Sequence, residues 1–457
     1  MQKKIFITDF TNGNVLVQLL VFSWPLMLSN LLQMVYNMVD MVVVGQFVGS
    51  AGLTAVSSGG DIMNIGTTVC MGFSAAGQIM ISQHIGRGNH EGIKKTIGTM
   101  FSFLLALSVV ITILGLLFRD MLIAAINVPP EAVEGARSYS TVCFYGMFFI
   151  FGYNILSAIL RGMGDSKRPL MFIAIAAVLN LVLDVVFVAT LGLGPWGAAL
   201  ATVIGQAVSF VISFTYLYHH KESFGFDFKP RSFSIDGSTL IRLLQLGLPM
   251  ALQHSVVVFS KLFVNSYINS YGLIMSAINA IGSKVGFCAS VVTQALGTAG
   301  TSMIGQNFGA GKLGRIKQIL GISTFCGLIF TTALSLIIIF NPEGVFGLFD
   351  RNELVLETSH IYVKIAVMNF TAFALRSAMM AFINGIGNAA LAFTIGVTDG
   401  IAGRVCLAIL LGVTFKMGIM GFWLGDVFAS FIPFVIGGIY FLSGLWKNRK
   451  LAVQTNK

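Results

Sequence analysis

Charged side chains are scarce in this sequence of 457 residues. Asp, Glu, Lys and Arg make up only 10% of the chain, and 56% of the residues are hydrophobic. Soluble domains contain about 25% charged residues, so this composition excludes an ordinary soluble protein. The sequence predicts an integral membrane protein.

Cysteine is also rare, and sequence motifs for several classes of chemistry are missing. The five cysteines are odd in number, fall within apolar stretches and lack C-x-x-C spacing, so we interpret them as packing residues. No Walker A motif, cluster of metal ligands or nucleophile triad is evident, which argues against an ATP-driven pump or a membrane enzyme. We therefore expect no enzymatic activity and no cofactor.

Long apolar stretches recur along the chain at the length needed to cross a bilayer, roughly 20 residues. They lack the alternation of a membrane β-barrel, so we predict helices. The fold class expected is all-α and integral to the membrane, with twelve transmembrane helices. The predicted spans are 15–47, 52–83, 93–117, 137–160, 169–191, 196–219, 239–269, 273–305, 316–340, 359–384, 389–413 and 418–446.

Basic residues are distributed unevenly between the predicted loops. The formal net charge is +10, and if both termini are cytoplasmic, 19 of the 28 Lys and Arg residues lie at the cytoplasmic side and 5 at the other. This asymmetry follows the positive-inside rule, so the charge indicates orientation and not a nucleic-acid partner. The start, MQKKIFITDFTNGN, has no signal-peptide cleavage site, and we predict that the first span stays as an anchor in the plasma (cytoplasmic) membrane.

The two halves of the sequence resemble each other at a nearly constant offset. ISQHIGRG at 81–88 matches IGQNFGAG at 304–311, and RGMGD at 161–165 matches NGIGN at 384–388, both 223 residues apart. Pro25 and Pro249 are 224 residues apart, as are Gly197 and Gly421. Such a duplication predicts two six-helix lobes related by a pseudo-twofold axis along the membrane normal.

The duplication divides the chain into an N-lobe at 1–220, a cytoplasmic inter-lobe loop at 221–238 and a C-lobe at 239–457. Pro25 and Pro249 lie within the first helix of each lobe, where a missing N–H group kinks a helix. We consider them candidate hinges, with a static bend as the alternative. We expect a monomer surrounded by membrane lipid.

Three segments carry a resemblance to a known family: YNMVDMVVVGQFVGSAGLTAV, SQHIGRG and LRGMGDSKRP. They resemble the multidrug and toxic compound extrusion (MATE) family, in its archaeal and DNA-damage-inducible-type branch. The resemblance implies two six-helix lobes around a central cleft, and efflux of organic compounds by alternating access, driven by H⁺ or Na⁺. In that branch the ion is handled by residues that match Asp40, Asn180, Asp184 and Thr202 of this chain.

The helical geometry of this candidate cation-coupling site is consistent with that role. Asp40, Asp184 and Thr202 each lie about six residues from the outer end of a predicted span, roughly 9 Å deep, and Asn180 lies on the same helix face as Asp184. Carboxylates inside a membrane are costly and mark ion pathways, although structural hydrogen bonds are the alternative. A bound proton or Na⁺ would neutralise the site, favour one lobe arrangement and weaken the hold on a cationic substrate.

The second half lacks these acids at the equivalent positions, which fall at Val264 and near Leu407. Asn180 corresponds to a position near Arg404, and Thr202 to Asp426. We hypothesise that Arg404 and Asp426 form a buried structural ion pair. Another branch of the family has acids in helices seven and ten, but the corresponding stretches here contain none.

Three further charges fall within predicted helices. Asp61 and Lys284 are related by the 223-residue offset, so we propose a contact between the lobes, with partners inside each lobe as the alternative. Lys261 aligns one turn before the position of Asp40 and could line the cleft; snorkelling or pairing is the alternative.

The function predicted is a secondary active multidrug efflux transporter, a cation (H⁺ or Na⁺) antiporter that exports small, cationic organic compounds. The alternative within transport is a lipid-linked sugar flippase of the same superfamily. An ion channel is a third alternative, which a kinked pseudo-twofold repeat does not favour.

Overall fold

The computed structural model describes residues 7–350 and 352–453, apart from the side chain of residue 273. Every regular element in this part of the chain is a helix. Ten of these helices are long and apolar enough to cross a membrane, or eleven if one bent pair is counted as a single span. The chain is therefore a multi-pass, all-helical membrane protein.

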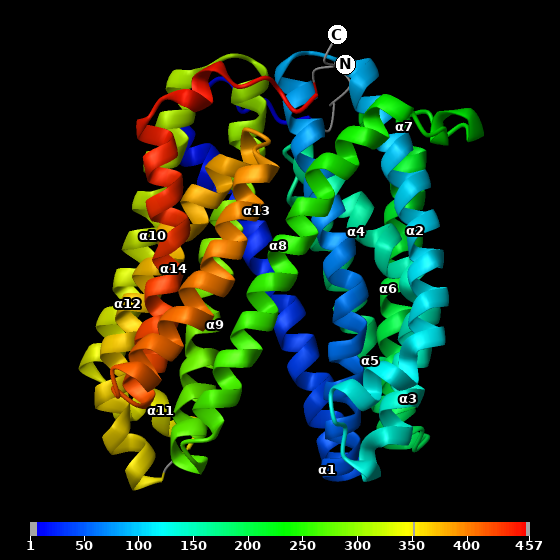
Figure 1. Cartoon of the computed structure of the whole chain (residues 1–457). Helices are drawn as coiled ribbons and strands as arrows, with labels where there is room; N and C mark the ends of the chain where they lie inside the picture. Colours follow the sequence, from blue (N-terminus) through cyan, green and yellow to red (C-terminus); the bar gives the residue numbers. More distant parts are fainter. Residues whose placement is uncertain (1–6, 351, 454–457) are drawn as a thin grey trace. The chain divides into compact units, whose positions relative to one another are not determined.

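Helix α1 (Val15–Gly86) has 72 residues, which at about 1.5 Å per residue is more than three times the thickness of a hydrocarbon core. Its backbone breaks at Gly49, where φ is 83° and ψ is −168°. The helix turns back at its lower end in Figure 1. The predicted number of twelve spans is reached only if the two arms of α1 are counted separately.

The backbone repeats the pattern found in the sequence. The equivalent of α1 in the second half is a pair of helices, α8 (Gly237–Asn269) and α9 (Leu273–Gly309), separated at Gly272. Gly49 and Gly272 both have positive φ, which glycine adopts without steric cost. Three further pairs of positive-φ glycines share the offset of 223 or 224 residues: Gly88 with Gly311, Gly164 with Gly387 and Gly194 with Gly418.

The chain forms two compact units. Unit 1 contains residues 24–251, together with 7–9, and unit 2 contains residues 10–23 and 252–453. These limits differ from the predicted lobes, because residues 10–23 belong to unit 2 and the first part of α8 belongs to unit 1. The chain changes unit next to Pro25 and again next to Pro249, and both prolines lie inside helices.

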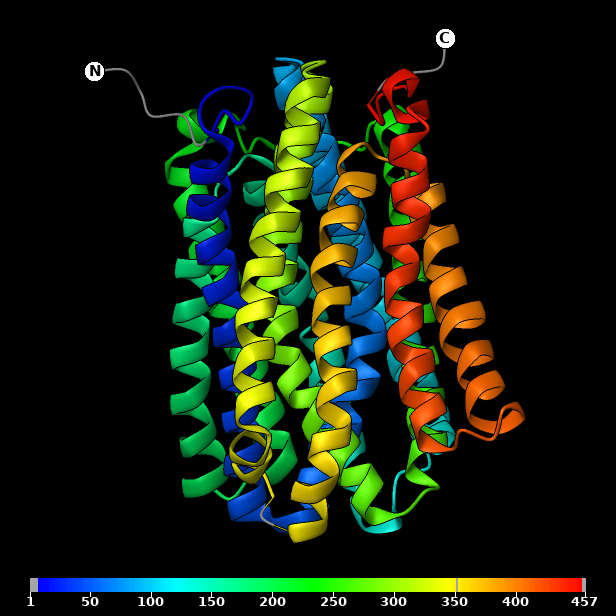
Figure 2. The ribbon, with the colours of Figure 1, turned by 90° about the vertical axis from the view of Figure 1, so that its left-hand side faces the viewer.

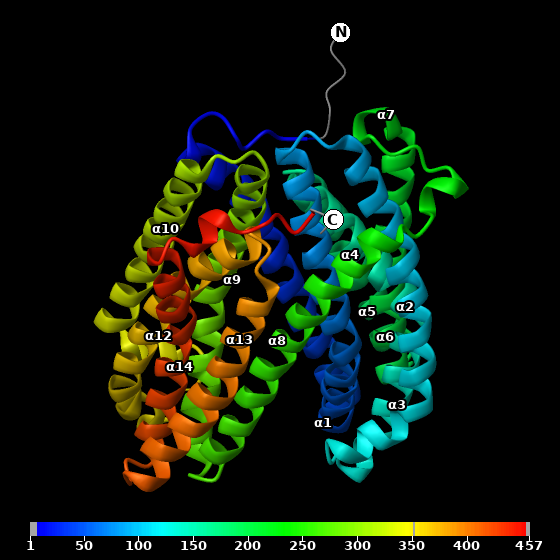
Figure 3. The ribbon, with the colours of Figure 1, turned by 45° about the horizontal axis from the view of Figure 1, so that its top comes forward.

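In unit 1, helices from distant parts of the sequence pack as a bundle, with α6 in contact with α3, α4 and α5 (Figure 3). The last turns after α5 are a π-helix, a form that often occurs at functional sites. The elements of this unit that follow α1 are α2 (His90–Ala125), α3 (Pro130–Tyr145), α4 (Met147–Gly162), α5 (Lys167–Asp184), η1 (Val185–Thr190), α6 (Gly194–His219), α7 (Lys221–Phe224) and η2 (Pro230–Phe233).

The fourth predicted span, 137–160, is not one straight helix. Helices α3 and α4 meet at Gly146 with a bend of 53°. A Cβ atom at Gly146 would lie 2.4 Å from Cγ2 of Val203 in α6, so the bend is also a point of close helix packing. A glycine at the bend lets α6 approach the backbone, which sequence periodicity does not indicate.

In unit 2, α12 packs against α9, α10 and α14, and Figure 2 shows α10, α12 and α14 running alongside one another. The fifth span of this half is again partly π-helical. The elements are α10 (Leu313–Phe340), α11 (Pro342–Gly347), α12 (Glu353–Gly385), α13 (Ala389–Val397), η3 (Thr398–Leu407), η4 (Leu410–Thr414), α14 (Ile419–Leu442) and η5 (Leu445–Asn448).

A capped turn precedes α8. The carboxylate of Asp236 accepts hydrogen bonds from Oγ of Ser238 and from the backbone N and Oγ1 of Thr239. These bonds, first that from Ser238, lower the pKa of Asp236 to about 2. The cap therefore stays ionised at neutral pH and compensates the unpaired N–H groups at the start of the helix.

Candidate functional site

The four residues predicted to handle a cation belong to one unit and to three of its helices. Asp40 lies in α1, Asn180 and Asp184 in α5, and Thr202 in α6. Asp40 is 6% exposed, Asn180 3% and Asp184 0%, and Thr202 is half-buried. The carboxylates of Asp40 and Asp184 are close enough to interact electrostatically. We call these four residues the unit-1 polar cluster.

Asn180 connects the other members of this cluster. In one orientation of its amide, Nδ2 donates to Oγ1 of Thr202 over 3.4 Å. In the other, which satisfies more partners, the nitrogen donates to Oδ2 of Asp184 over 3.2 Å and the oxygen accepts from the backbone N of Thr202 over 3.2 Å. The amide thus holds α5 and α6 together beside a carboxylate.

Three buried oxygen atoms around the cluster have no hydrogen-bond partner among the described residues: Oδ1 of Asp40, Oδ1 of Asp184 and Oε1 of Gln206. Buried polar atoms normally have a partner. A pocket of about 180 Å³ lies beside them, lined by Tyr36, Ala176, Asn180, Thr202, Gly205 and Gln206. Unpaired oxygens next to a small pocket fit a bound proton or a small cation, because hard cations prefer oxygen ligands.

Two members of this site, Tyr36 and Gln206, are absent from the sequence prediction. Tyr36 comes four residues before Asp40, and Gln206 comes four residues after Thr202. Residues at this spacing share a helix face. A search for polar residues one turn from each predicted ligand would have found both.

Helix α3 adds two buried side chains to the surroundings of the cluster. Tyr139 interacts electrostatically with both Asp40 and Asp184, and Cys143 with Asp40. Both pack in an apolar core with Val43 and Val44 of α1. This core gives the cluster a surrounding of low polarity, which disfavours an uncompensated charge.

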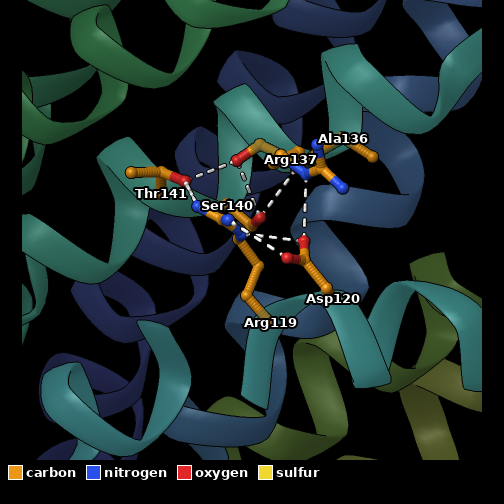
Figure 4. Close-up of polar contacts among 6 residues, drawn as sticks. All are labelled: Arg119, Asp120, Ala136, Arg137, Ser140 and Thr141. Atoms are coloured by element: carbon orange, nitrogen blue, oxygen red, sulfur yellow. Dashed lines mark hydrogen bonds and ion pairs between the residues drawn. The ribbon is translucent and has the colours of Figure 1, made fainter. Parts of the chain in front are cut away.

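A polar clamp fixes α3 against the end of α2 (Figure 4). Nη1 of Arg119 donates to Oγ1 of Thr141 over 2.7 Å. Asp120 pairs with Nε of Arg119 at 3.2 Å and with Nε of Arg137 at 2.9 Å. Thr141 lies between Tyr139 and Cys143 in the sequence, so the clamp restrains the part of α3 that faces the carboxylates.

Unit 2 contains a second group of buried charges, with opposite chemistry. Arg404 pairs with Asp426, and its Nε lies 3.1 Å from Oδ1 of Asp399. Its Nη2 donates to Oγ of Ser430 over 3.0 Å, and Asp399 also pairs with Arg376. The hypothesised partners Arg404 and Asp426 are in contact, but as part of a larger network. We call Arg376, Asp399, Arg404 and Asp426 the unit-2 ion network.

Asp399 is fully buried in η3 and was not among the predicted residues. The sequence comparison inspected helices seven and ten for acids, whereas Asp399 follows in the next span. A list of every acid within an apolar stretch would have identified it, since such residues are rarely incidental.

The sequence matches the MatE family model over residues 25–186 and again over 249–399. The two matches begin at Pro25 and Pro249, as expected for a duplicated domain, and together they cover more than half of the chain. This chain belongs to the MatE family. Asp40, Asn180 and Asp184 lie within the first match; Thr202, Arg404 and Asp426 lie outside both.

Curated MatE-type relatives cover most of the chain. It is 34% identical over 310 residues to the "Probable multidrug resistance protein YpnP" of Bacillus subtilis, covering 67% of this chain and 68% of that protein. It is 28% identical over 437 residues to the "Probable multidrug resistance protein YoeA" of the same organism, covering 94% of each. The solved outward-facing conformation of a multidrug resistance MATE family transporter superposes with a TM-score of 0.88 at 23% identity, covering 98% of this chain and 99% of that one.

The remaining predicted residues of this MatE protein occupy separate places. Asp61 is exposed in unit 1, and Lys284 is exposed in unit 2 with Nζ 5.8 Å from the ring centroid of Phe349. Their proposed contact stays a prediction, because it would join the two units. Lys261 is exposed on α8 and interacts electrostatically with the unit-2 ion network. No group of three or more His, Cys, Asp or Glu residues that could hold a metal is found in residues 7–350 and 352–453.

Proposed function

We propose that this MatE protein is a cation-coupled exporter of small organic compounds, working by alternating access with H⁺ or Na⁺ as the coupling ion. Its curated relatives are named multidrug resistance proteins, which supports this class of substrate. The observation that carries the proposal is the pair of buried carboxylates, Asp40 and Asp184, each with an oxygen that has no partner among the described residues.

The mechanism follows from the cost of burying charge. An ionised carboxylate inside the membrane costs about 2.5–3.5 kcal/mol on insertion scales, and two close together cost more. A proton or Na⁺ relieves that cost, with Asn180 and Thr202 supplying further oxygen atoms. Ion occupancy thereby changes the charge of the unit-1 polar cluster from negative towards neutral and weakens its attraction for a cationic substrate.

The protein is proposed to lie in the cytoplasmic membrane with both termini in the cytoplasm. The excess of Lys and Arg on one side of the predicted topology supports this orientation. Pro25 and Pro249 are proposed hinges, since the chain passes from one compact unit to the other beside each of them.

The test is transport by the purified protein in proteoliposomes under an imposed H⁺ or Na⁺ gradient. Asp40→Asn and Asp184→Asn keep the size of the side chain and remove its charge. We expect each to abolish gradient-driven efflux, a loss of at least about 100-fold, because the ion no longer has a charge to compensate.

Glu134→Gln is the matched control, because Glu134 is an exposed acid at the start of α3, away from the cluster. It should transport like the wild type. Gradient-driven efflux that persists in both Asn variants would contradict the coupling role. Dependence on one gradient only would identify the ion.

A lipid-linked sugar flippase remains the alternative within the superfamily. The same proteoliposomes distinguish the two, since a flippase would move a fluorescent lipid-linked sugar and leave organic cations untouched. An ion channel would give currents without coupled efflux.

A further inference from the structure

The unit-2 ion network is electrically balanced. It contains two guanidinium groups, Arg376 and Arg404, and two carboxylates, Asp399 and Asp426, joined by three ion pairs. Asp399 and Arg404 are almost completely buried, and Asp426 is 28% exposed. The four residues neutralise one another, so the network itself has no need of a ligand.

Lys261 adds a positive charge that this network does not neutralise. Its ammonium group interacts electrostatically with all four members, two attractively and two repulsively. It forms no ion pair within 4 Å in the part of the chain that the structure describes. Lys261 is therefore an excess cation next to a balanced network.

The position of Lys261 argues against simple snorkelling to the membrane surface. It lies eight residues before the end of α8 at Asn269, about 12 Å from that end. A lysine side chain spans roughly half that distance. A charge held at this depth is costly and faces a water-filled cavity or a partner of opposite charge.

Lys261 belongs to an exposed row of residues on α8, His254, Val258, Lys261 and Asn265, which we call the donor stripe. The spacing of four, three and four places them on one helix face. The oxygen of Asn265 accepts a hydrogen bond from Asn279 over 3.1 Å, which leaves its NH₂ group as a donor. Val258 is 52% exposed and offers apolar contact beside these polar groups.

The donor stripe is packed closely against the helix that carries Asp399. A Cβ atom at Gly396 would lie 2.3 Å from Cγ of Gln253, and one at Gly400 would lie 2.7 Å from Cγ1 of Val256. The two glycines are one turn apart on α13 and η3. They bring α8 close enough for the network to orient Lys261 without pairing with it.

We propose that the donor stripe binds the anionic oxygen group, a carboxylate, of an organic anion or zwitterion that the protein exports. Lys261 provides the charge, Asn265 a hydrogen bond, and Val258 a contact for the carbon skeleton. This inference rests on the proposed function and adds a substrate class to it. Unit 1 would handle cations and unit 2 the acidic part of the substrate.

The experiment uses two probes that differ by one group, a rhodamine with a free carboxylate and its ethyl ester. Binding to the purified full-length protein is measured by fluorescence polarisation, and export is measured separately in proteoliposomes. Lys261→Gln should weaken binding of the carboxylate dye by about tenfold or more, the value of a charge-assisted hydrogen bond. Binding of the ester should stay the same.

Lys261→Arg should retain most of the affinity for the carboxylate dye, and Lys364→Gln, which removes an exposed lysine of α12, should behave as the wild type. Equal affinity losses for both dyes, or no loss for either, would overturn the inference. Displacement of the carboxylate dye by phosphatidylglycerol from the wild type alone would assign the stripe to a lipid head group and overturn the substrate assignment. Selective binding without export of either dye would instead count against the proposed function.

Discussion

Arg404 shows how one residue can hold three helical segments together. Its side chain is 1% exposed and contacts Asp399 in its own helix, and Asp426 and Ser430 in α14. A buried ion pair adds little net stability compared with apolar packing, but breaking it leaves an uncompensated charge. The residue is thus more important for what its loss exposes than for the energy of its contacts.

Replacement of this arginine should therefore be far more damaging than removal of the pair. We expect Arg404→Met to destabilise the protein by about 3–5 kcal/mol, seen as a lower melting temperature of the purified protein. The double variant Arg404→Met/Asp426→Asn leaves Arg376 with Asp399 and should recover much of that loss. A double variant as unstable as the single one would show that packing, and not charge, is the main contribution.

Helix packing in unit 2 depends on glycines whose role lies in their contacts. A Cβ atom at Gly421 would lie 2.4 Å from the backbone N of Gly412, so α14 and η4 touch backbone to backbone. No flexible side chain can move aside there. Gly438, in the same helix, has nothing within 4 Å of its Cβ position.

These two glycines provide a matched pair of substitutions within α14. Gly421→Ala should destabilise the protein by about 1–3 kcal/mol, the usual cost of overpacking. Gly438→Ala should be neutral or stabilising by about 0.5–1 kcal/mol, because alanine favours a helix. Thermal unfolding of both variants measures this, and equal melting temperatures would contradict the contact at Gly421.

At the scale of the whole molecule, the chain enters unit 2 before it builds unit 1. The backbone N of Phe10 donates to Oε1 of Gln306 over 2.9 Å, and Nδ2 of Asn307 donates to the oxygen of Phe10 over 3.0 Å. Arg315 donates to the carbonyl of Gly13 over 2.8 Å. The segment before the first span is therefore anchored to the loop that ends the eighth predicted span.

Loss of this anchor should loosen the start of α1. Arg315→Gln removes donors to the carbonyls of Phe10 and Gly13 and to Oε1 of Gln18. We expect faster amide hydrogen exchange over residues 10–18, because the backbone there loses its partners. Lys317→Gln, an exposed lysine of the same helix, should leave exchange unchanged; equal protection in both variants would show that Arg315 does not hold the segment.

The sequence alone was sufficient for the class of fold, because a run of about 20 apolar residues must satisfy its backbone internally and so forms a helix in a membrane. It was also sufficient for the duplication, since the glycines that turn the chain recur at the same offset. The candidate ligands Asp40 and Asp184 stand out because an acid is costly in such a run.

Only the tertiary structure showed which side chains surround those ligands and how the chain is divided between units. Tyr36, Gln206 and Asp399 take their place from the packing of separate helices, which periodicity along one helix cannot reveal. The exchange of residues 10–23 into unit 2 depends on contacts nearly 300 residues apart in sequence. Local pattern sets the helices, whereas long-range packing decides which polar groups meet.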